Sequence, residues 1–105
     1  MPDAGAAGEA LALDPLIHER MRLAIMSTLA VHEALSFNEL KGLLDTTDGN
    51  LSVHARRLEA ADYINSTKLY EGGARTIFRI TDEGRRALGH YFDQLEGLIR
   101  TTRGQ

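Results

Sequence analysis

The sequence contains no cysteine and only two prolines in 105 residues. The lack of cysteine excludes disulfide bonds, thiolate metal sites and a cysteine nucleophile, and it is compatible with a reducing compartment. No apolar run approaches the roughly 20 residues that span a bilayer, and the N-terminus lacks the basic region of a secretion signal. We therefore expect a cytoplasmic protein with no membrane partner.

The chain also lacks a positive excess, since its formal net charge is −3. This balance argues against a protein that coats nucleic acid indiscriminately. Basic residues nevertheless gather in the middle of the chain, with acids among them, at Arg56, Arg57, Lys68, Arg75 and Arg79. Any binding to DNA should therefore be selective and sensitive to salt. With 43% hydrophobic residues, the chain has enough apolar side chains for one small domain.

The strongest local pattern is a helix-turn-helix over residues 36–62. Ser36 and Glu39 form a capping box at the start of the first helix. The polar segment 45–49 then ends that helix and offers several N-caps for the next. The first helix carries an apolar stripe of Phe37, Leu40 and Leu44.

The second helix of this motif has two different faces. Leu51, Ala55 and Leu58 fall on one side, which we expect to pack, with His54 at its edge. The other side carries the residue types that read base edges and hold phosphates in a major groove. A solvated surface is the plainer interpretation of such a face. The candidate DNA contacts of the motif are Thr46, Thr47, Asn50, Ser52, Val53, Arg56 and Arg57.

Before this motif, residues 1–13 show no clear period and are predicted to form a mobile arm, of which Leu11 and Leu13 are the residues that could dock. Asp14 and Pro15 predict the start of a helix, as N-cap and first helical residue. That helix should end within residues 32–34. Its core-facing stripe would be Ile17, Met21, Ala24, Ile25 and Leu29.

After the motif, Asp62 stands where a left-handed residue often ends a helix. Residues 63–70 and 76–81 have strand-like compositions and predict a hairpin with a glycine tip. Its apolar residues Phe78 and Ile80 would share the core with Ile64. An ordinary loop between strands is the alternative to a functional tip. The candidate contacts of the hairpin to DNA are Lys68, Gly72, Gly73 and Arg75.

A last helix is predicted over residues 82–100, capped by Thr81, with a short tail over 101–105. Apolar residues recur along it at alternating spacings of four and three, as in a coiled-coil seam. We expect this surface to pair with a second copy, because it exceeds what a small domain would cover; the alternative is that the helix closes its own core. The proposed seam is Leu88, Tyr91, Phe92, Leu95, Leu98 and Ile99.

From about residue 13 to 98 the sequence resembles small winged-helix transcriptional regulators near the MarR and ArsR families. The resemblance is carried by RLAIMSTL, LSFNELKGLLDTTDGNLSVHARRLEAADYI and RTIFRITDEGRRAL. It implies an α+β, mostly helical winged-helix domain over residues 14–100, with the helix-turn-helix at 36–62, the wing at 63–81 and a dimerisation helix at 82–100. Two departures from the family pattern are Asp62 in place of glycine and Ala55 in place of a larger aliphatic residue.

These patterns favour a homodimeric, sequence-specific DNA-binding regulator, most simply a repressor, that binds double-stranded DNA at a palindromic operator. The alternative is a winged-helix module that docks a partner protein, which the acidic net charge would suit. A sensor with an unidentified small-molecule effector or a metal elaborates the first hypothesis, but His90 and Asp93 alone are a weak metal pattern. No nucleophile is paired with a base, and no phosphate-binding glycine motif is present. We therefore predict no enzyme activity, no metal and no cofactor.

Overall fold

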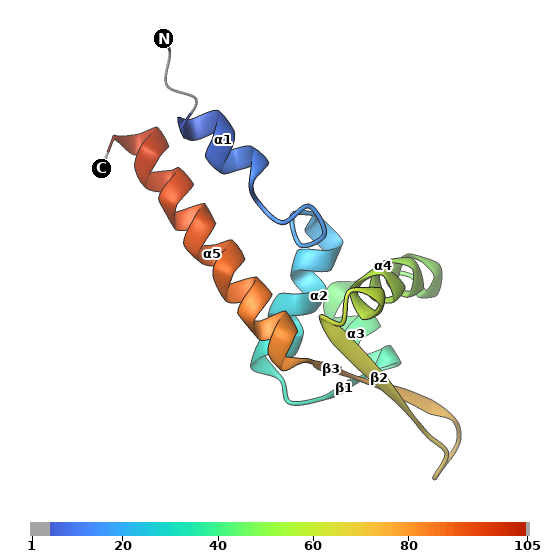
Figure 1. The fold of residues 1–105 in the computed structure, drawn as a ribbon. Helices are drawn as coiled ribbons and strands as arrows, with labels where there is room; N and C mark the ends of the chain where they lie inside the picture. Colours follow the sequence, from blue (N-terminus) through green and yellow to red (C-terminus); the bar gives the residue numbers. More distant parts are fainter. Residues whose placement is uncertain (1–4, 105) are drawn as a thin grey trace.

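The computed structural model describes residues 5–104, which form a mostly helical α+β fold. Figure 1 shows α5 running along one side of the molecule, with α1 beside its C-terminal part and a β-hairpin projecting from the opposite end. The body is elongated and measures 63 × 25 × 22 Å. The elements are α1 (Gly5–Leu11), α2 (Arg20–Val31), β1 (Leu35–Ser36), α3 (Phe37–Leu44), α4 (Asp48–Ala60), β2 (Ile64–Leu69), β3 (Arg75–Ile80) and α5 (Asp82–Arg103).

The predicted helix-turn-helix is confirmed as α3 and α4. The Ser36 hydroxyl accepts a hydrogen bond from the backbone N–H of Glu39 at 3.1 Å, and the Glu39 carboxylate accepts one from the Ser36 N–H at 2.9 Å, as expected for a capping box. Asp45 ends α3 in the left-handed conformation, and Thr47 caps α4. The predicted inner face of α4, Leu51, Ala55 and Leu58, is buried in the core.

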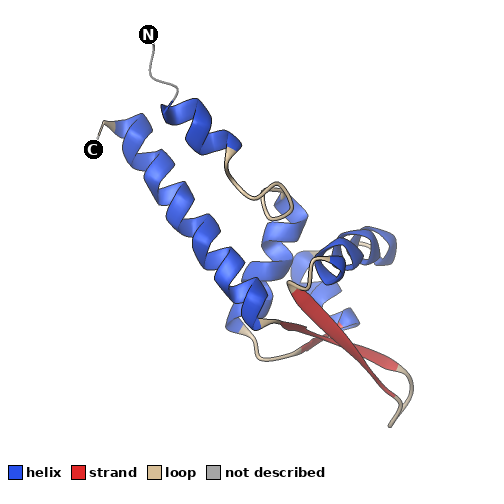
Figure 2. Ribbon diagram, in the orientation of Figure 1, coloured by secondary structure: helices blue, strands red, loops and turns tan. Residues whose placement is uncertain are grey.

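The predicted hairpin is confirmed as β2 and β3, but it belongs to a larger sheet. The short strand β1 pairs with the other side of β3, which gives an antiparallel sheet in the order β1-β3-β2 (Figure 2). Leu35 lies opposite Phe78 in this pairing. A two-residue strand has no period of its own, so the pattern did not reveal it. Asp62 has φ 61°, the left-handed conformation expected before β2.

The first turn of α5 is fixed to the beginning of β2. Thr81 caps the helix, and its hydroxyl also donates to the backbone carbonyls of Asp62 and Tyr63, at 2.5 and 3.1 Å. Gly84 packs so closely that a Cβ there would lie 2.0 Å from the Tyr63 carbonyl oxygen. Only glycine fits this position, so it sets the angle at which α5 leaves the sheet.

The predicted start of the helix before the motif is wrong. Asp14 begins a single turn, in which its carboxylate accepts from the Leu16 N–H at 2.9 Å and its carbonyl from the His18 N–H at 2.8 Å. The turn ends at Glu19, which is extended and caps α2 in its place. Ile17 is nevertheless fully buried, so the predicted core residue reaches the core from a turn and not from a helix.

The sequence predicted a mobile N-terminal arm, but part of this segment is helical in the structure. Within the predicted mobile arm, α1 lies along α5, and the Thr101 hydroxyl donates to the Glu9 carboxylate at 2.6 Å. Leu13 is buried whereas Leu11 is exposed. At the other end, α5 continues past the predicted residue 100 to Arg103. Residues 1–4 of the arm and residue 105 of the tail lie outside the described part of the chain.

The predicted seam along α5 divides into two parts. Leu88 and Tyr91 lie in the core of their own chain, so they cannot face a second copy. The Tyr91 hydroxyl lies 2.7 Å from His18 Nδ1 in the turn before α2, a contact that the seven-residue pattern alone did not predict. Phe92 and Ile99 remain 41% and 43% exposed, and Leu95 and Leu98 are half-buried. Among the helices of residues 5–104, none combines the length and apolar character that crossing a membrane requires.

Candidate nucleic-acid interface

Polar contacts between α4, α2 and the turn that precedes α2 fix the position of α4 on its inner side. The buried Arg22 guanidinium donates to His54 Nδ1 at 3.0 Å and to the Leu16 carbonyl oxygen at 2.5 Å. The Glu19 carboxylate lies 3.6 Å from His54 Nδ1. Burial acts to raise the pKa of Glu19, but backbone hydrogen bonds from Arg22 and Met21 and the nearby positive charges lower it overall. His54, at the edge of the packed face of α4, therefore anchors this helix.

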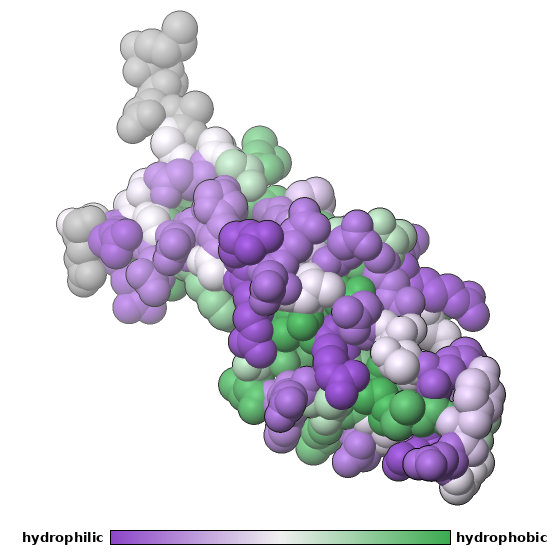
Figure 3. Space-filling model, turned by 60° about the horizontal axis from the view of Figure 1, so that its bottom comes forward, coloured by the Kyte–Doolittle hydropathy of each residue, from purple (hydrophilic) through white to green (hydrophobic). Residues whose placement is uncertain are grey.

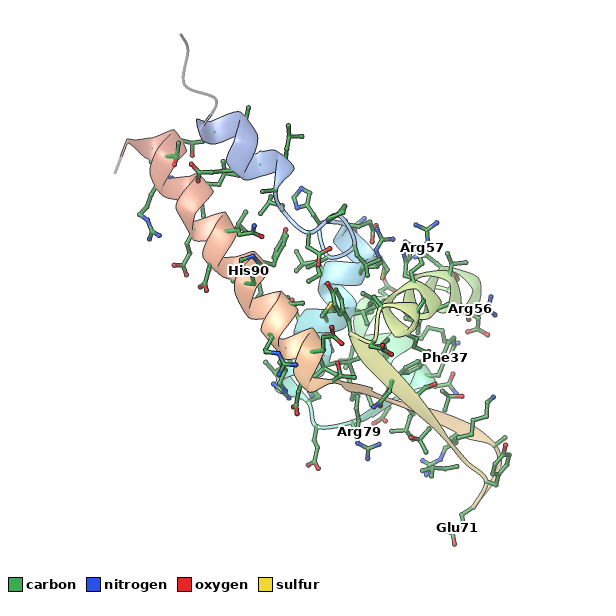
Figure 4. All side chains as sticks on the ribbon, in the orientation of Figure 1. Phe37, Arg56, Arg57, Glu71, Arg79 and His90 are labelled. Atoms are coloured by element: carbon green, nitrogen blue, oxygen red, sulfur yellow. The ribbon has the colours of Figure 1, made fainter. Side chains whose placement is uncertain are left out.

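The outward face of α4 carries two arginines that are free to bind a ligand. Arg56 and Arg57 are exposed and make no hydrogen bond or ion pair within residues 5–104. Figure 4 shows both on the outer side of α4, away from the body of the protein. Val53 is exposed on the same helix, and Ser52 is half-buried.

The predicted contacts at the start of α4 are already engaged with one another. The Thr47 hydroxyl accepts from the Asn50 N–H at 3.2 Å, and the Asn50 side-chain amide donates to the Thr46 hydroxyl at 2.9 Å. Lys41 forms an ion pair with Asp48 at 2.7 Å across the turn. This network orders the turn, and it leaves the Asn50 side-chain oxygen as an acceptor that faces solvent.

A groove separates α4 from the hairpin. It has a volume of about 310 Å³, and Arg56 and Lys68 contribute cations to its lining from opposite sides. Glu59 also lines it and accepts a hydrogen bond from the Ser66 hydroxyl at 3.3 Å. The sequence pattern did not assign Glu59 of α4 or Phe37 of α3 to this groove, because the groove forms only when the hairpin folds against these two helices. The lining residues are Phe37, Ser52, Arg56, Glu59, Ser66, Lys68, Thr76 and Phe78.

The hairpin tip lies apart from this groove. Gly72 and Gly73 have φ 72° and 106°, which residues with side chains rarely adopt, so they are needed for the turn itself. Arg75 lines a second hollow of about 230 Å³ beside Phe37. The Ser36 hydrogen bonds lower the pKa of Glu39, and the charge of Arg75 adds to this effect. The structure thus joins Lys68 to the α4 face but gives Arg75 a separate position.

The remaining surface offers less to a nucleic acid. Arg79 points to the side of the hairpin opposite Arg56 and Arg57 (Figure 4). With the underside of the molecule turned forward, apolar surface appears as patches interrupted by polar side chains (Figure 3). Among residues 5–104, no group of three or more His, Asp or Glu side chains could hold a metal ion, and His90 is exposed on α5.

Comparisons with known proteins agree with this geometry. Residues 21–99 match the family model of the winged helix DNA-binding domain. An uncharacterized protein of Methanocaldococcus jannaschii is 36% identical over 81 residues, which cover 76% of this chain and 88% of that protein.

Solved structures extend the similarity to the fold. A transcriptional regulator homologue from Pyrococcus horikoshii is 27% identical, with a TM-score of 0.84 over 92% of this chain and 96% of that chain. MarR has a TM-score of 0.72 at 18% identity, covering 83% of this chain and 64% of its own. AbfR bound to DNA also has a TM-score of 0.72 at 18% identity, covering 87% of this chain and 67% of its own. The chain therefore belongs to the winged-helix DNA-binding family, and its fold is that of the MarR-type transcriptional regulators.

Proposed function

We propose that this protein is a homodimeric, sequence-specific DNA-binding repressor that acts in the cytoplasm by occupying a promoter. The observation that carries the proposal is the outward face of α4, where Arg56 and Arg57 have no partner within residues 5–104. A helix of this kind fits the major groove, where guanidinium groups bind base edges or phosphates. The activity is binding alone, with no chemical step.

The hairpin supports a second contact to the same duplex. Lys68 lines the groove on the side opposite Arg56, so a backbone that follows α4 would meet both cations. The exposed tip at Gly72 and Gly73 projects beyond the body, and Arg75 lies beside it. We assign these residues to the phosphate backbone, where contacts strengthen binding to all sequences alike. The AbfR structure, which shares the fold, is described as bound to DNA.

Dimerisation through α5 is supported by the incomplete burial of the C-terminal half of that helix within a single chain. The buried residues of α5 are Gly84, Leu88 and Tyr91, so none is buried from Phe92 onward. The segment α1, which lies beside this half, has no buried residue either. A short helix covered so little is marginal in water, and a second copy would bury Phe92, Leu95, Leu98 and Ile99. A two-fold dimer would place its two α4 helices about 34 Å apart, which fits a palindromic operator.

Selection of bound sites from random duplex DNA at physiological salt tests the proposal. We expect enrichment of one imperfect palindrome whose half-sites are about one helical turn apart. Enrichment of no sequence would favour the alternative, a module that docks a partner protein. Against that alternative, the outward face of α4 presents no aromatic side chain, the residue type that protein interfaces favour.

A further inference from the structure

The centre of the outward face of α4 contains no hydrogen-bonding side chain. With 3.6 residues per turn, Gly49, Val53 and Ala60 lie within about 30° of the direction opposite the buried Leu51, Ala55 and Leu58. Arg56 and Arg57 lie about 50° to either side of that direction. If α4 enters a groove with this face first, the arginines flank the point of deepest approach, and Val53 occupies it.

Two of these central residues have no structural reason to be there. Val53 is 50% exposed, and a β-branched residue lowers helix propensity without a gain from burial at such a site. Gly49 is helical, and an added Cβ would meet nothing within 4 Å. Gly49 is not among the glycines with positive φ, so its backbone conformation does not require glycine either. Exposed apolar residues occur singly on most surfaces, but here an unexplained valine and an unexplained glycine lie one turn apart on the same face.

We propose that Val53 recognises the 5-methyl group of a thymine in the major groove, and that Gly49 lets the start of α4 come close enough for this contact. An aliphatic side chain cannot read a base by hydrogen bonds, and the thymine methyl is the apolar group that the major groove presents. The neighbouring Asn50 side-chain oxygen is a free acceptor for an adjacent amino group. This inference rests on the proposed function and adds the chemical identity of one base in each half-site.

The experiment removes small apolar groups from both partners, the thymine methyl from the DNA and the valine methyls from the protein. The probe is the duplex enriched by the selection above, with each thymine replaced in turn by deoxyuridine, which lacks only the methyl group. For the unaltered protein we expect one position per half-site at which uracil weakens binding about fourfold, the value of one buried methyl group. For Val53→Ala we expect weaker binding to the thymine duplex and no further effect of uracil at that position.

Control variants separate recognition from folding. Val31→Ala removes the same atoms from an exposed valine on α2 and should keep the uracil sensitivity. Gly49→Ala should bind the duplex more weakly while its melting temperature stays equal or rises, since the added methyl has room. A Val53→Ala variant that keeps the full uracil sensitivity, or an unaltered protein with none, overturns this inference and leaves the proposed function standing. Failure to enrich any duplex overturns both.

Discussion

The helices α4 and α5 are both amphipathic, but the chain covers them to different degrees. The inner face of α4 is fully buried, and His54 is held by Arg22 from behind. In α5 the last buried residue is Tyr91, and the following half of the helix lies beside the short helix α1. One end of the molecule is therefore complete within one chain, and we propose that the other is completed by a second copy. The experiments below challenge this contrast, beginning with the largest expected effect.

Phe92→Asp combined with Ile99→Asp should give a folded monomer, because both positions are exposed in the single chain. A charge buried without a partner costs about 3 kcal/mol or more, so we expect apparent operator affinity to fall about 100-fold or more. Sedimentation equilibrium at micromolar concentration measures the mass. Val31→Asp, which changes an exposed apolar residue on α2, should remain dimeric. A dimer that survives the double change would place the interface elsewhere, for example at Leu11, which is 86% exposed on α1.

Gly84→Ala tests the close packing between the first turn of α5 and the backbone of Tyr63, just before β2. Because the new methyl group would lie 2.0 Å from the Tyr63 carbonyl oxygen, we expect the free energy of unfolding to fall by about 1–3 kcal/mol. Gly89→Ala, in the same helix with open space around it, should raise that free energy by about 0.5–1 kcal/mol. Urea denaturation compares them. Equal stability of the two variants would mean that the backbone around Gly84 and Tyr63 shifts at little cost to make room for the added methyl group.

Arg56→Ala and Arg57→Ala test the outward face of α4. Each should weaken operator binding by about 1–3 kcal/mol if the residue reads a base, and should reduce the salt slope by about one if it holds a phosphate. Titrations at several salt concentrations distinguish these outcomes. Arg79→Ala removes the same charge from the far side of the hairpin and should change neither quantity. If all three variants behave alike, the effect is one of net charge, and α4 has no special role.

Tyr63→Phe tests a single hydrogen bond, between Tyr63 and the turn before α2. The Tyr63 hydroxyl donates to the Asp14 carboxylate at 2.6 Å, and this bond, aided by burial, raises the pKa of Tyr63 to about 12. The protonated hydroxyl therefore stabilises the fold below pH 10, the ordinary tyrosine pKa, and that contribution is lost as the pH rises to about 12. The variant should lose about 1 kcal/mol at neutral pH and show a flatter stability profile over that alkaline range.

Thermal or urea unfolding at a series of pH values gives this profile. Tyr70→Phe, at an exposed position after β2, should keep the profile of the unaltered protein. A steep alkaline loss in Tyr63→Phe as well would assign the effect to another group, such as Tyr91, whose pKa is raised by burial.

The parts of the fold that the sequence predicted are those governed by neighbouring residues. The capping box at Ser36 and the left-handed Asp62 follow from local chemistry, and both are confirmed. The Asp14 signal was also local, but the extended Glu19 and its contact with Arg22 overrode it, since Arg22 bonds both to the preceding turn and to His54. The predicted arm lacked periodicity, and α1 depends on contacts with α5 that no local pattern encodes.

The candidate site shows the same limit. The helical wheel correctly placed Arg56 and Arg57 on the outward face of α4. It did not place Glu59 in the groove, because that depends on how β2 and β3 lie against the helix. The α5 pattern likewise identified apolar residues but not which of them the chain's own core takes, so Tyr91 was assigned to the wrong surface.

The elongated shape of the chain affects how its assembly state should be measured. Its radius of gyration is 16.2 Å, whereas a compact domain of this length has about 13 Å. A body of 63 × 25 × 22 Å meets more friction in solution than a sphere of the same mass. A single copy would thus leave a size-exclusion column early, at the volume of a heavier globular protein. An elution volume would overestimate the mass of each species, whereas a method independent of shape, such as sedimentation equilibrium or light scattering, reports the number of chains.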